Sequence, residues 1–480
     1  MRQSGRLLGV AVLLGLAAGC ASMEDKAGLK QVGADVQGRI GQRVVWNQGM
    51  EDDRKVAQEL AKVLEGELTA DAAVQSALLN NRRLQAKFED LGIAQADLVQ
   101  AGLLSNPVFS IMARFPDGGG GTNLELGINQ QFMELVSLPL RKKVAKSHFE
   151  QAQAQVADVV LDLAAQTRQA FVELQFAQQT VEMRQWIQRA AQASEEAALR
   201  LREAGNTRQL DLESERATAQ QAELDLESAQ REVAAAREKL VRLMGLPAWS
   251  KATKITTRMP EVPEERFDAP SLERQAMDQR LDLMAARHAA EAAAQSLGIA
   301  KIQLWLEGSS IGVDTERDVS GSRVTGPRAD VPIPLFDQGQ AVRAKAKAQL
   351  RQMRQNYLAL KTEVASEIRD SLTRLAVSAS HARRYQHTLL PLRERITHLT
   401  QLQYNAMQVS VFQLMQAKQQ EVMAGQAYLG SLRDYWLARS SLERSVGRDI
   451  ALPAPITPVS RPATAPAVQQ TTDHSMRMER

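Results

Sequence analysis

The strongest constraint on the fold is a pattern that the chain contains twice. Gly205 and Met407 are 202 residues apart, and so are Gly245 and Gly447. The first pair lies in short turns between helix-forming stretches, and the second pair lies where such stretches end. An internal repeat of this length decides the architecture before any local feature does. The chain is therefore predicted to contain two copies of one structural unit.

Each unit is predicted to contain a helix, two strands, a long helix, a tight turn and a return helix. The helices carry apolar residues at heptad spacing, and only 4% of the residues are aromatic, which is typical of long packed helices. The first unit (70–245) divides into a helix at 70–104, a β-hairpin at 107–132, a long helix at 137–203, a tip at 204–207 and a return helix at 208–245. The second unit (271–447) divides into a helix at 271–302, strands at 303–313 and 323–334, a long helix at 336–404, a tip at 405–409 and a return helix at 410–447.

The helix lengths are consistent with one another. In each unit the first helix and the return helix, placed end to end, match the length of the long helix. At about 1.5 Å per residue, a long helix of this size spans on the order of 100 Å. The predicted fold class is thus mainly α, with a small β part.

The strand candidates have one apolar and one polar face. In the segment 107–132, Phe109, Ile111 and Leu126 alternate with Ser110 and Glu125. This alternation is typical of a soluble hairpin that packs on a helix, and equally of strands that face lipid on one side and water on the other. Both interpretations stay open for this segment alone.

The amino terminus reads as a secretory signal peptide at 1–19. Arg2 and Arg6 precede an apolar run that is too short to span a membrane, and small residues precede Cys20, the only cysteine in the chain. Because Cys20 falls where the signal ends, we expect it to be the site of lipid attachment and the mature amino terminus. An ordinary signal peptide with an incidental cysteine is the alternative.

The remaining segments are read as connections. Residues 20–69 are predicted to form an arm with short helical pieces, 246–270 a proline-containing connector, and 448–480 a disordered tail rich in Pro and Ala. After the signal, no run of about twenty apolar residues occurs, so no transmembrane helix is expected.

The sequence contains no recognisable catalytic or cofactor motif. It lacks a phosphate loop and a HExxH pattern, and no basic stripe with interleaved aromatics indicates nucleic-acid binding. His381, His387 and His398 are spaced so that they do not share one helix face, which argues against a metal site. We expect no enzyme activity, no cofactor and no metal centre.

The ordered set of segments resembles the TolC family of outer-membrane efflux proteins over about 70–447. The stretches "VPIPLFDQGQAVRAKAKAQL" (331–350), "LREAGNTRQLDLESERA" (201–217) and "LVRLMG" (240–245) carry the resemblance. It implies a homotrimer with a twelve-stranded β-barrel, continued by a long periplasmic α-helical barrel. It also implies a lipid-anchored outer-membrane channel that works with a periplasmic adaptor protein and an inner-membrane pump. The junction "FMELVSLPLRKKVAKS" (132–147) departs from the family by lacking a glycine.

The resemblance places the candidate site residues at the two tips. Gly205 is expected to make a left-handed turn, Asn206 or Thr207 to cap the first return helix, and Ser410 to cap the second. Adaptor docking is assigned to Gly205, Asn206, Thr207, Leu210, Met407, Gln408 and Val409. Arg200, Arg202 and Asp211 are candidates for holding the aperture closed. Two alternatives remain: a periplasmic adaptor lipoprotein and a soluble coiled-coil scaffold.

Overall fold

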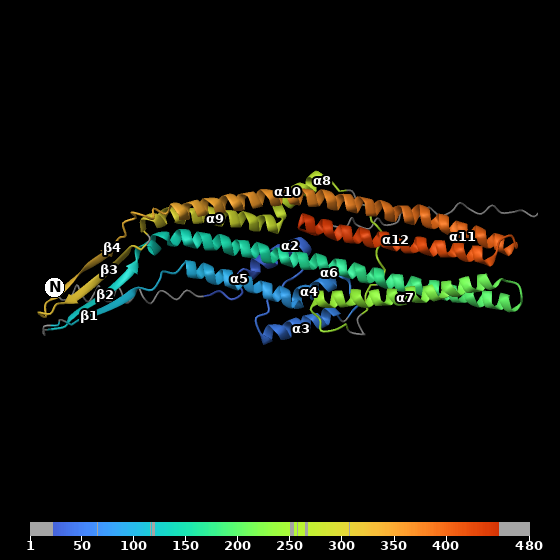
Figure 1. Cartoon of the computed structure of the whole chain (residues 1–480), viewed down its shortest axis with the longest axis horizontal. Coiled ribbons are helices and arrows are strands. Elements are labelled where there is room, and N and C mark those ends of the chain that lie inside the picture. Colours follow the sequence, from blue (N-terminus) through green and yellow to red (C-terminus); the bar gives the residue numbers. More distant parts are fainter. Residues whose placement is uncertain are drawn as a thin grey trace, which may run out of the picture.

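The computed structural model describes residues 23–64, 66–115, 117, 121–249, 254–256, 258–264, 267–306 and 308–450. The predicted signal peptide, Cys20 and the tail beyond residue 450 lie outside these residues. The described part is a rod that has a small sheet at one end and two helical turns at the other (Figure 1). None of its helices combines the length and the apolar composition needed to cross a membrane.

The first half of the rod is built around one very long helix. The arm contains α2 (Leu29–Ile40) and α3 (Met50–Leu64), and is followed by α4 (Ala70–Asn80) and α5 (Arg82–Ala101). The long helix α6 spans Phe132–Glu203, and the return helix α7 spans Gln209–Met244. Helix α6 begins five residues before the predicted start, because strand β2 leads directly into it, and Pro139 lies inside it.

The predicted helix 70–104 is wrong in one respect, since it is two helices. Asn81 has extended backbone angles, and its side-chain oxygen accepts hydrogen bonds from the backbone N–H groups of Arg83 and Leu84. This is N-cap geometry, in which a side chain satisfies the free donors at a helix start. Asn81 therefore ends α4 and starts α5, and α5 ends at Ala101 rather than at residue 104.

The second half contains α8 (Ala269–Gln279), α9 (Leu281–Leu306), α10 (Gln340–Arg384), α11 (Leu390–Asn405) and α12 (Val411–Val446). The predicted helix 271–302 is likewise two helices, and α9 continues through residues 303–306, which were assigned to a strand. The predicted long helix 336–404 starts later, at Gln340, and is interrupted by a π-helical turn, η1 (Tyr385–Leu389). Pro391 follows this turn and explains it, because proline offers no N–H to the preceding turn and its ring crowds the carbonyl four residues earlier.

The sheet has four antiparallel strands in the order β1–β2–β3–β4. They are β1 (Val108–Arg114), β2 (Asn123–Gln131), β3 (Ser310–Arg317) and β4 (Arg323–Asp330). Strand β3 reaches into the predicted loop 314–322, and β4 ends before Pro332. The register aligns Phe109 with Ile128 and Ile128 with Val313, so these three apolar residues, which come from both halves, share one face.

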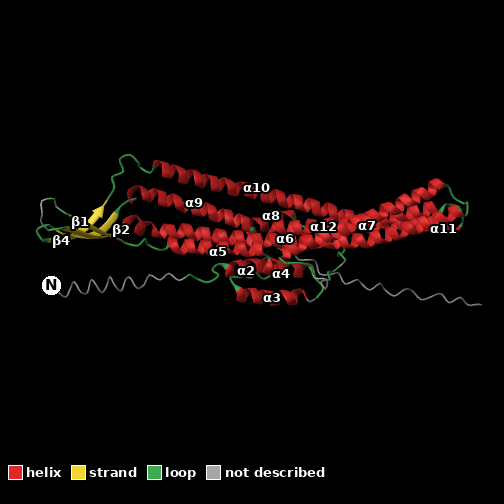
Figure 2. Cartoon of the chain, turned by 60° about the horizontal axis from the view of Figure 1, so that its bottom comes forward, coloured by secondary structure: helices red, strands yellow, loops and turns green. Residues whose placement is uncertain are grey.

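The helices form one layer. Contacts join α5 and α7 to α6, α6 to α9 and α12, and α9 and α12 to α10. The order across the layer is therefore α5/α7, then α6, then α9/α12, then α10/α11. Figure 1 shows α5 and α7 along one lateral border and α10 and α11 along the other, and Figure 2 shows the arm helices α2 and α3 on one side of this layer.

The end-to-end junctions are made by glycine. Gly245 has φ +69° and ends α7 against Asn80, whose side chain donates a 2.6 Å hydrogen bond to the Gly245 carbonyl. Gly447, with φ +83°, ends α12 against Arg280, which lies between α8 and α9. Only α5 and α9 continue the lines of the return helices. The predicted stacking of the whole segment 70–104 is therefore wrong, because α4 packs against both α6 and α7 and does not continue the line of α7.

Candidate functional site

The sheet has an exposed apolar face. Four of its apolar side chains are more than half exposed, namely those of Phe109, Ile111, Ile128 and Val313. They come from three neighbouring strands and are brought together by the antiparallel register. A contiguous apolar patch of this kind marks a surface that contacts lipid or protein.

The opposite face of the sheet is charged. Arg328 lies 3.4 Å from Asp314 and 3.9 Å from Glu125, and Arg114 lies 3.4 Å from Glu125. Glu125 and Glu316 stand directly opposite each other on β2 and β3. With Asp330, this face carries four carboxylates and two guanidinium groups along the described strands.

Both lateral borders of the chain are open at the sheet. Strands β1 and β4 each have one paired edge and one free edge. Strand β1 follows α5, and β4 precedes α10, so the free strand edges lie on the same two sides as the edges of the helical layer. Free strand edges pair readily with another strand, and in lipid every backbone group must be paired. The chain is therefore complementary to further strands and helices on both sides.

The first tip closes with a left-handed glycine. Gly205 has φ +74°, and the N–H groups of Gly205 and Asn206 donate to the carbonyls of Arg202 and Leu201 at 2.9 and 2.8 Å. These bonds satisfy the last carbonyls of α6. The predicted cap of the return helix is wrong, since neither Asn206 nor Thr207 holds that position. Arg208 is the N-cap.

Asp211 organises the start of α7 from inside the helix. Its carboxylate accepts hydrogen bonds from the Thr207 hydroxyl at 3.3 Å and from the Arg208 backbone N–H and guanidinium at 3.4 and 3.0 Å. The Arg208 side-chain hydrogen bond lowers the pKa of Asp211 below its usual value. An acidic residue in the first turn of a helix often supplies this reciprocal bond to the N-cap backbone.

The second tip has the same backbone pattern without a glycine. Met407 has φ +58°, and the N–H groups of Met407 and Gln408 donate to Tyr404 and Gln403 at 2.9 Å each. Ser410 caps α12, as the sequence predicts. The Gln413 side-chain oxygen accepts a 3.1 Å hydrogen bond from the Ser410 backbone N–H. The Met407 side chain is 94% exposed, and Leu210 of the first tip is 69% exposed. Gln408 is also exposed, and Val409 is partly buried.

Within the described part of the protein, the three candidate gating residues form hydrogen bonds and ion pairs to their own hairpin. Arg200 pairs with Glu196 one turn earlier, and the Arg202 guanidinium donates to the Thr207 carbonyl at 3.2 Å. Asp211 pairs with Arg208. The structure thus places all three at the first tip but does not join them to the second tip.

A groove of about 660 Å³ separates the two hairpins near the tips. Met183 and Trp186 line it from α6, and Phe412 and Met415 line it from α12. Trp186 is 65% exposed, and the Arg189 guanidinium lies 4.2 Å from its ring centre. The sequence analysis did not predict this groove. A lone tryptophan on a helix otherwise rich in Ala and Gln was the available signal.

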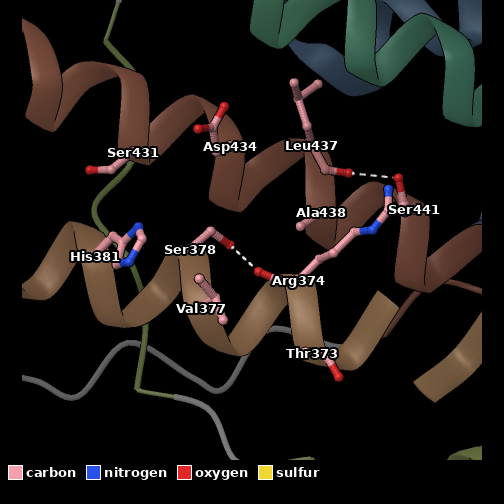
Figure 3. Close-up of a pocket in the computed structure, with 10 residues that line it drawn as sticks. All are labelled: Thr373, Arg374, Val377, Ser378, His381, Ser431, Asp434, Leu437, Ala438 and Ser441. Carbon is pink, nitrogen blue, oxygen red and sulfur yellow. Dashed lines mark hydrogen bonds between the residues drawn. The ribbon is translucent and has the colours of Figure 1, made fainter. Parts of the chain in front are cut away.

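A second groove, of about 470 Å³, lies between α10 and α12. Figure 3 shows the Arg374 side chain of α10 extending toward Ser441 of α12 and His381 lying across from Ser431, while the Asp434 carboxylate points away from α10. His387 lies in η1 and His398 in α11, so the three histidines do not converge. Among the described residues, no group of three or more His, Cys, Asp or Glu side chains has an arrangement suited to a metal ion.

Partly buried ion pairs join different parts of the chain in the middle of the rod. Arg168 of α6 pairs with Asp449 and lies 3.7 Å from Glu443 of α12, and the Asp449 N–H donates to the Arg39 carbonyl of the arm. Burial raises the pKa of Glu443 to about 7, against the opposing effect of the nearby Arg168. Burial acts to lower the pKa of Arg168, but the bond with Asp449 outweighs it and raises that pKa. These pairs join the arm and both halves of the chain.

No protein-family model matches the chain. The cobalt-zinc-cadmium resistance protein CzcC of Cupriavidus metallidurans is 24% identical over 395 residues, which cover 80% of this chain and 91% of CzcC.

Solved structures show the same fold at low identity. CusC, described in terms of transmembrane channel formation, matches with a TM-score of 0.65 and 18% identity over 79% of this chain and 92% of its own. The outer membrane protein VceC of Vibrio cholerae matches with a TM-score of 0.65 and 17% identity over 79% and 96%. The outer membrane channel CmeC of Campylobacter jejuni matches with a TM-score of 0.66 and 15% identity over 84% and 89%. The rod with its terminal sheet is thus a fold that this chain shares with these proteins.

Proposed function

We propose that this chain, whose fold is that of the TolC-like outer-membrane efflux proteins, is the outer-membrane channel of an efflux or secretion system. The resemblance inferred from the sequence is confirmed for the fold. In this proposal the sheet lies in the outer membrane, and the helices extend into the periplasm. The observation that carries it is the sheet itself, which has an exposed apolar face, a charged face and two free edges.

The free edges support a closed homotrimer. Four strands cannot form a closed barrel, and two copies would give eight, a number whose interior is filled by side chains. Three copies give twelve strands and are the smallest closed assembly of this unit with room for a water-filled duct. The helical layer closes in the same step, when α10/α11 of one copy meets α5/α7 of the next.

The tips support docking of a periplasmic adaptor, which would link the channel to an inner-membrane pump. Met407 and Leu210 expose apolar side chains at the end of the rod farthest from the sheet. Holding Met407 in the left-handed region costs about 1–2 kcal/mol, and strain of this kind clusters at binding sites. The channel itself would be passive, with the energy supplied by the pump. Cys20 would carry the lipid anchor in the outer membrane.

The cargo is proposed to be cationic. The charged face of the sheet, which would line the exit, has an excess of carboxylates. The relative CzcC is named for resistance to cobalt, zinc and cadmium, which favours divalent metal ions among the cations. Growth on these metals with and without the gene would test this point.

The first experiment is purification of the full-length chain from membranes in detergent, followed by measurement of its oligomeric mass, particle shape and conductance. A trimeric rod more than about 100 Å long that conducts ions in a planar bilayer supports the channel. A soluble monomer or dimer that is free of the membrane fraction would favour the scaffold, and a membrane-bound monomer without conductance would favour the adaptor lipoprotein.

A further inference from the structure

The sheet end of the rod carries an unusual concentration of basic side chains. The stretch Gln340–Leu360 at the start of α10 contains five Lys or Arg residues and no Asp or Glu, whereas the whole chain has 59 basic and 56 acidic residues. The start of α6 is similar, with "RKKVAK" at 141–146. Charge is therefore segregated at the same level of both long helices.

Most of these side chains have no close acidic partner among the described residues. Lys142, Lys347 and Arg351 are exposed, and none of them has a carboxylate within 4 Å in the described part of the protein. Lys146 is 67% exposed and has only a 3.7 Å contact with Glu150. We call these four residues the basic collar. Three of them form no ion pair inside the described part of the fold, and Lys146 has a single long one with Glu150.

The collar lies on the face of the helical layer that carries the arm and the connector. Gly28 of the arm packs against Phe149 and Gln153 of α6, and Lys142 and Lys146 precede these residues at helical spacing on the same face. On α10, Arg383 donates a 2.8 Å hydrogen bond to the connector carbonyl of Pro263. Lys347 lies 36 residues earlier, which is about ten helical turns, so it shares that face.

Helix α9 shows that both halves of the collar lie at the same height. Leu140 of α6 reaches within 3.8 Å of the position that a Cβ on Gly298 would occupy. Val342 of α10 lines a groove together with Ala300, half a turn from Gly298. Lys142 and Lys347 follow these contacts in the direction away from the sheet, and both come level with residues 295–296 of α9.

The order of side chains along this face follows the profile of a lipid leaflet. The apolar sheet face comes first, followed by exposed Leu135 on α6 and by Ile333 and Phe336 beside α10, and then by the collar. Lys142 lies about 16 Å beyond the end of β2 at 1.5 Å per residue. A tilted strand of eight residues, the length of β3 and β4, spans a height of about 20 Å. This is less than the apolar band of about 25 Å on membrane-spanning sheets. The thickness of the headgroup layer and the length of a lysine side chain account for the remaining distance between the end of the apolar band and the backbone of Lys142.

We propose that the basic collar binds the phosphate groups of anionic phospholipid in the inner leaflet of the outer membrane, with phosphatidylglycerol as the lipid to test. This inference rests on the proposed function, because it requires the sheet to lie in that membrane. The collar sets the depth of the rod: apolar residues above it enter the interface, and the cations hold the headgroups below. Attraction of this kind contributes at distances up to a Debye length of about 8–10 Å.

The test is native mass spectrometry of the full-length protein in detergent, titrated with phosphatidylglycerol or phosphatidylcholine of the same acyl chains. Wild type should bind phosphatidylglycerol more tightly, and the difference should shrink as salt rises. Each collar charge removed should weaken that binding about fivefold, which corresponds to about 1 kcal/mol. The double variant Lys142→Gln/Lys347→Gln should therefore lose about 25-fold for phosphatidylglycerol and little for phosphatidylcholine. The control Lys55→Gln/Lys62→Gln, on exposed arm residues, should bind as wild type does.

Three outcomes overturn the inference. Equal binding of the two lipids by wild type removes the need for a collar. An equal loss in the arm control shows that net charge alone matters. A collar variant that falls apart into smaller oligomers shows that these side chains contact a neighbouring copy instead of lipid. Fractionation of the cell envelope separates this inference from the proposed function. A chain that is absent from the outer membrane would contradict both. A chain that is in the outer membrane but shows no lipid preference would contradict only the lipid-binding role of the collar.

Discussion

Replacing Gly245 by Ala tests whether the end of α7 is fixed by a close backbone contact. A Cβ at this position would lie 2.5 Å from the Asn80 carbonyl oxygen and 2.9 Å from its carbon, and φ is +69°. Gly205 is the matched control, because its φ is +74° and nothing lies within 4 Å of its Cβ position. The two glycines therefore share the backbone conformation and differ only in their surroundings.

The expected costs follow from that difference. At Gly205, alanine in the left-handed region costs about 1–2 kcal/mol, less about 0.4–1 kcal/mol for the reduced freedom of the unfolded chain, which leaves about 1 kcal/mol. At Gly245 the same balance applies. The clash adds about 1–3 kcal/mol, and weakening the bond from Asn80 to the Gly245 carbonyl adds about 1 kcal/mol. We expect a total of about 3–5 kcal/mol.

Thermal unfolding in detergent, followed by the far-UV circular dichroism of the helices, measures the difference in Tm between the variants at the two positions. With an unfolding entropy of about 2.1 cal/mol/K per residue, a chain of this size loses about 1 °C of Tm for each kcal/mol. Gly205→Ala should lower Tm by about 1 °C and Gly245→Ala by about 3–5 °C. Asparagine tolerates the left-handed region, so Gly245→Asn should stay costly while Gly205→Asn is nearly neutral. Equal losses at the two positions would refute the close-contact reasoning.

Three further predictions concern charged residues. The pKa of Glu443 is about 7 in the folded chain and 4.5 by default, so the folded state holds this proton more tightly, and its contribution to stability should fall as pH rises from about 4.5 to 7; Glu443→Gln should flatten the dependence of Tm on pH in that range, and an unchanged slope would contradict it. Arg280 is 6% exposed and donates hydrogen bonds to Asp282 and to the Ser445 carbonyl, so Arg280→Ala should cost about 1.5–3 kcal/mol by removing charge-assisted hydrogen bonds, seen as a Tm loss beyond that of an exposed Arg→Ala change. If Arg200 and Arg202 help to close the aperture, replacing both with Ala should raise the closed-state conductance in a planar bilayer, and an unchanged conductance would remove them from that role.

The sequence predicted the elements whose signals are periodic. Long helices and alternating strands bury or expose whole faces, and this periodic pattern does not depend on any single residue. The predicted helix boundaries were wrong where a single residue determines them. Asn81 reads as a helical residue in a window average, yet its side chain caps α5 and breaks the helix. Pro391 was a visible signal that went unused, and it accounts for the π-turn at Tyr385–Leu389.

The sites were harder to predict than the elements. The tips were located because turn residues are local, but Arg208 replaced Asn206 and Thr207 as the cap because Asp211 supplies the bond from within the helix. The groove beside Trp186 depends on how far the two hairpins diverge. That separation is a tertiary property, set by packing over more than two hundred residues of sequence.

The two tips together argue that Met407 is retained for contact. Both tips use the same backbone hydrogen bonds, and Gly205 shows that glycine satisfies the left-handed position without strain. A methionine there costs about 1–2 kcal/mol of strain and gains no packing, since its side chain is 94% exposed. Thioether side chains adapt to varied apolar surfaces and are common at binding sites. A partner that covers Met407, which is the adaptor in the proposed function, would account for this strained and exposed side chain, and Met407→Gly should then weaken adaptor binding without lowering Tm.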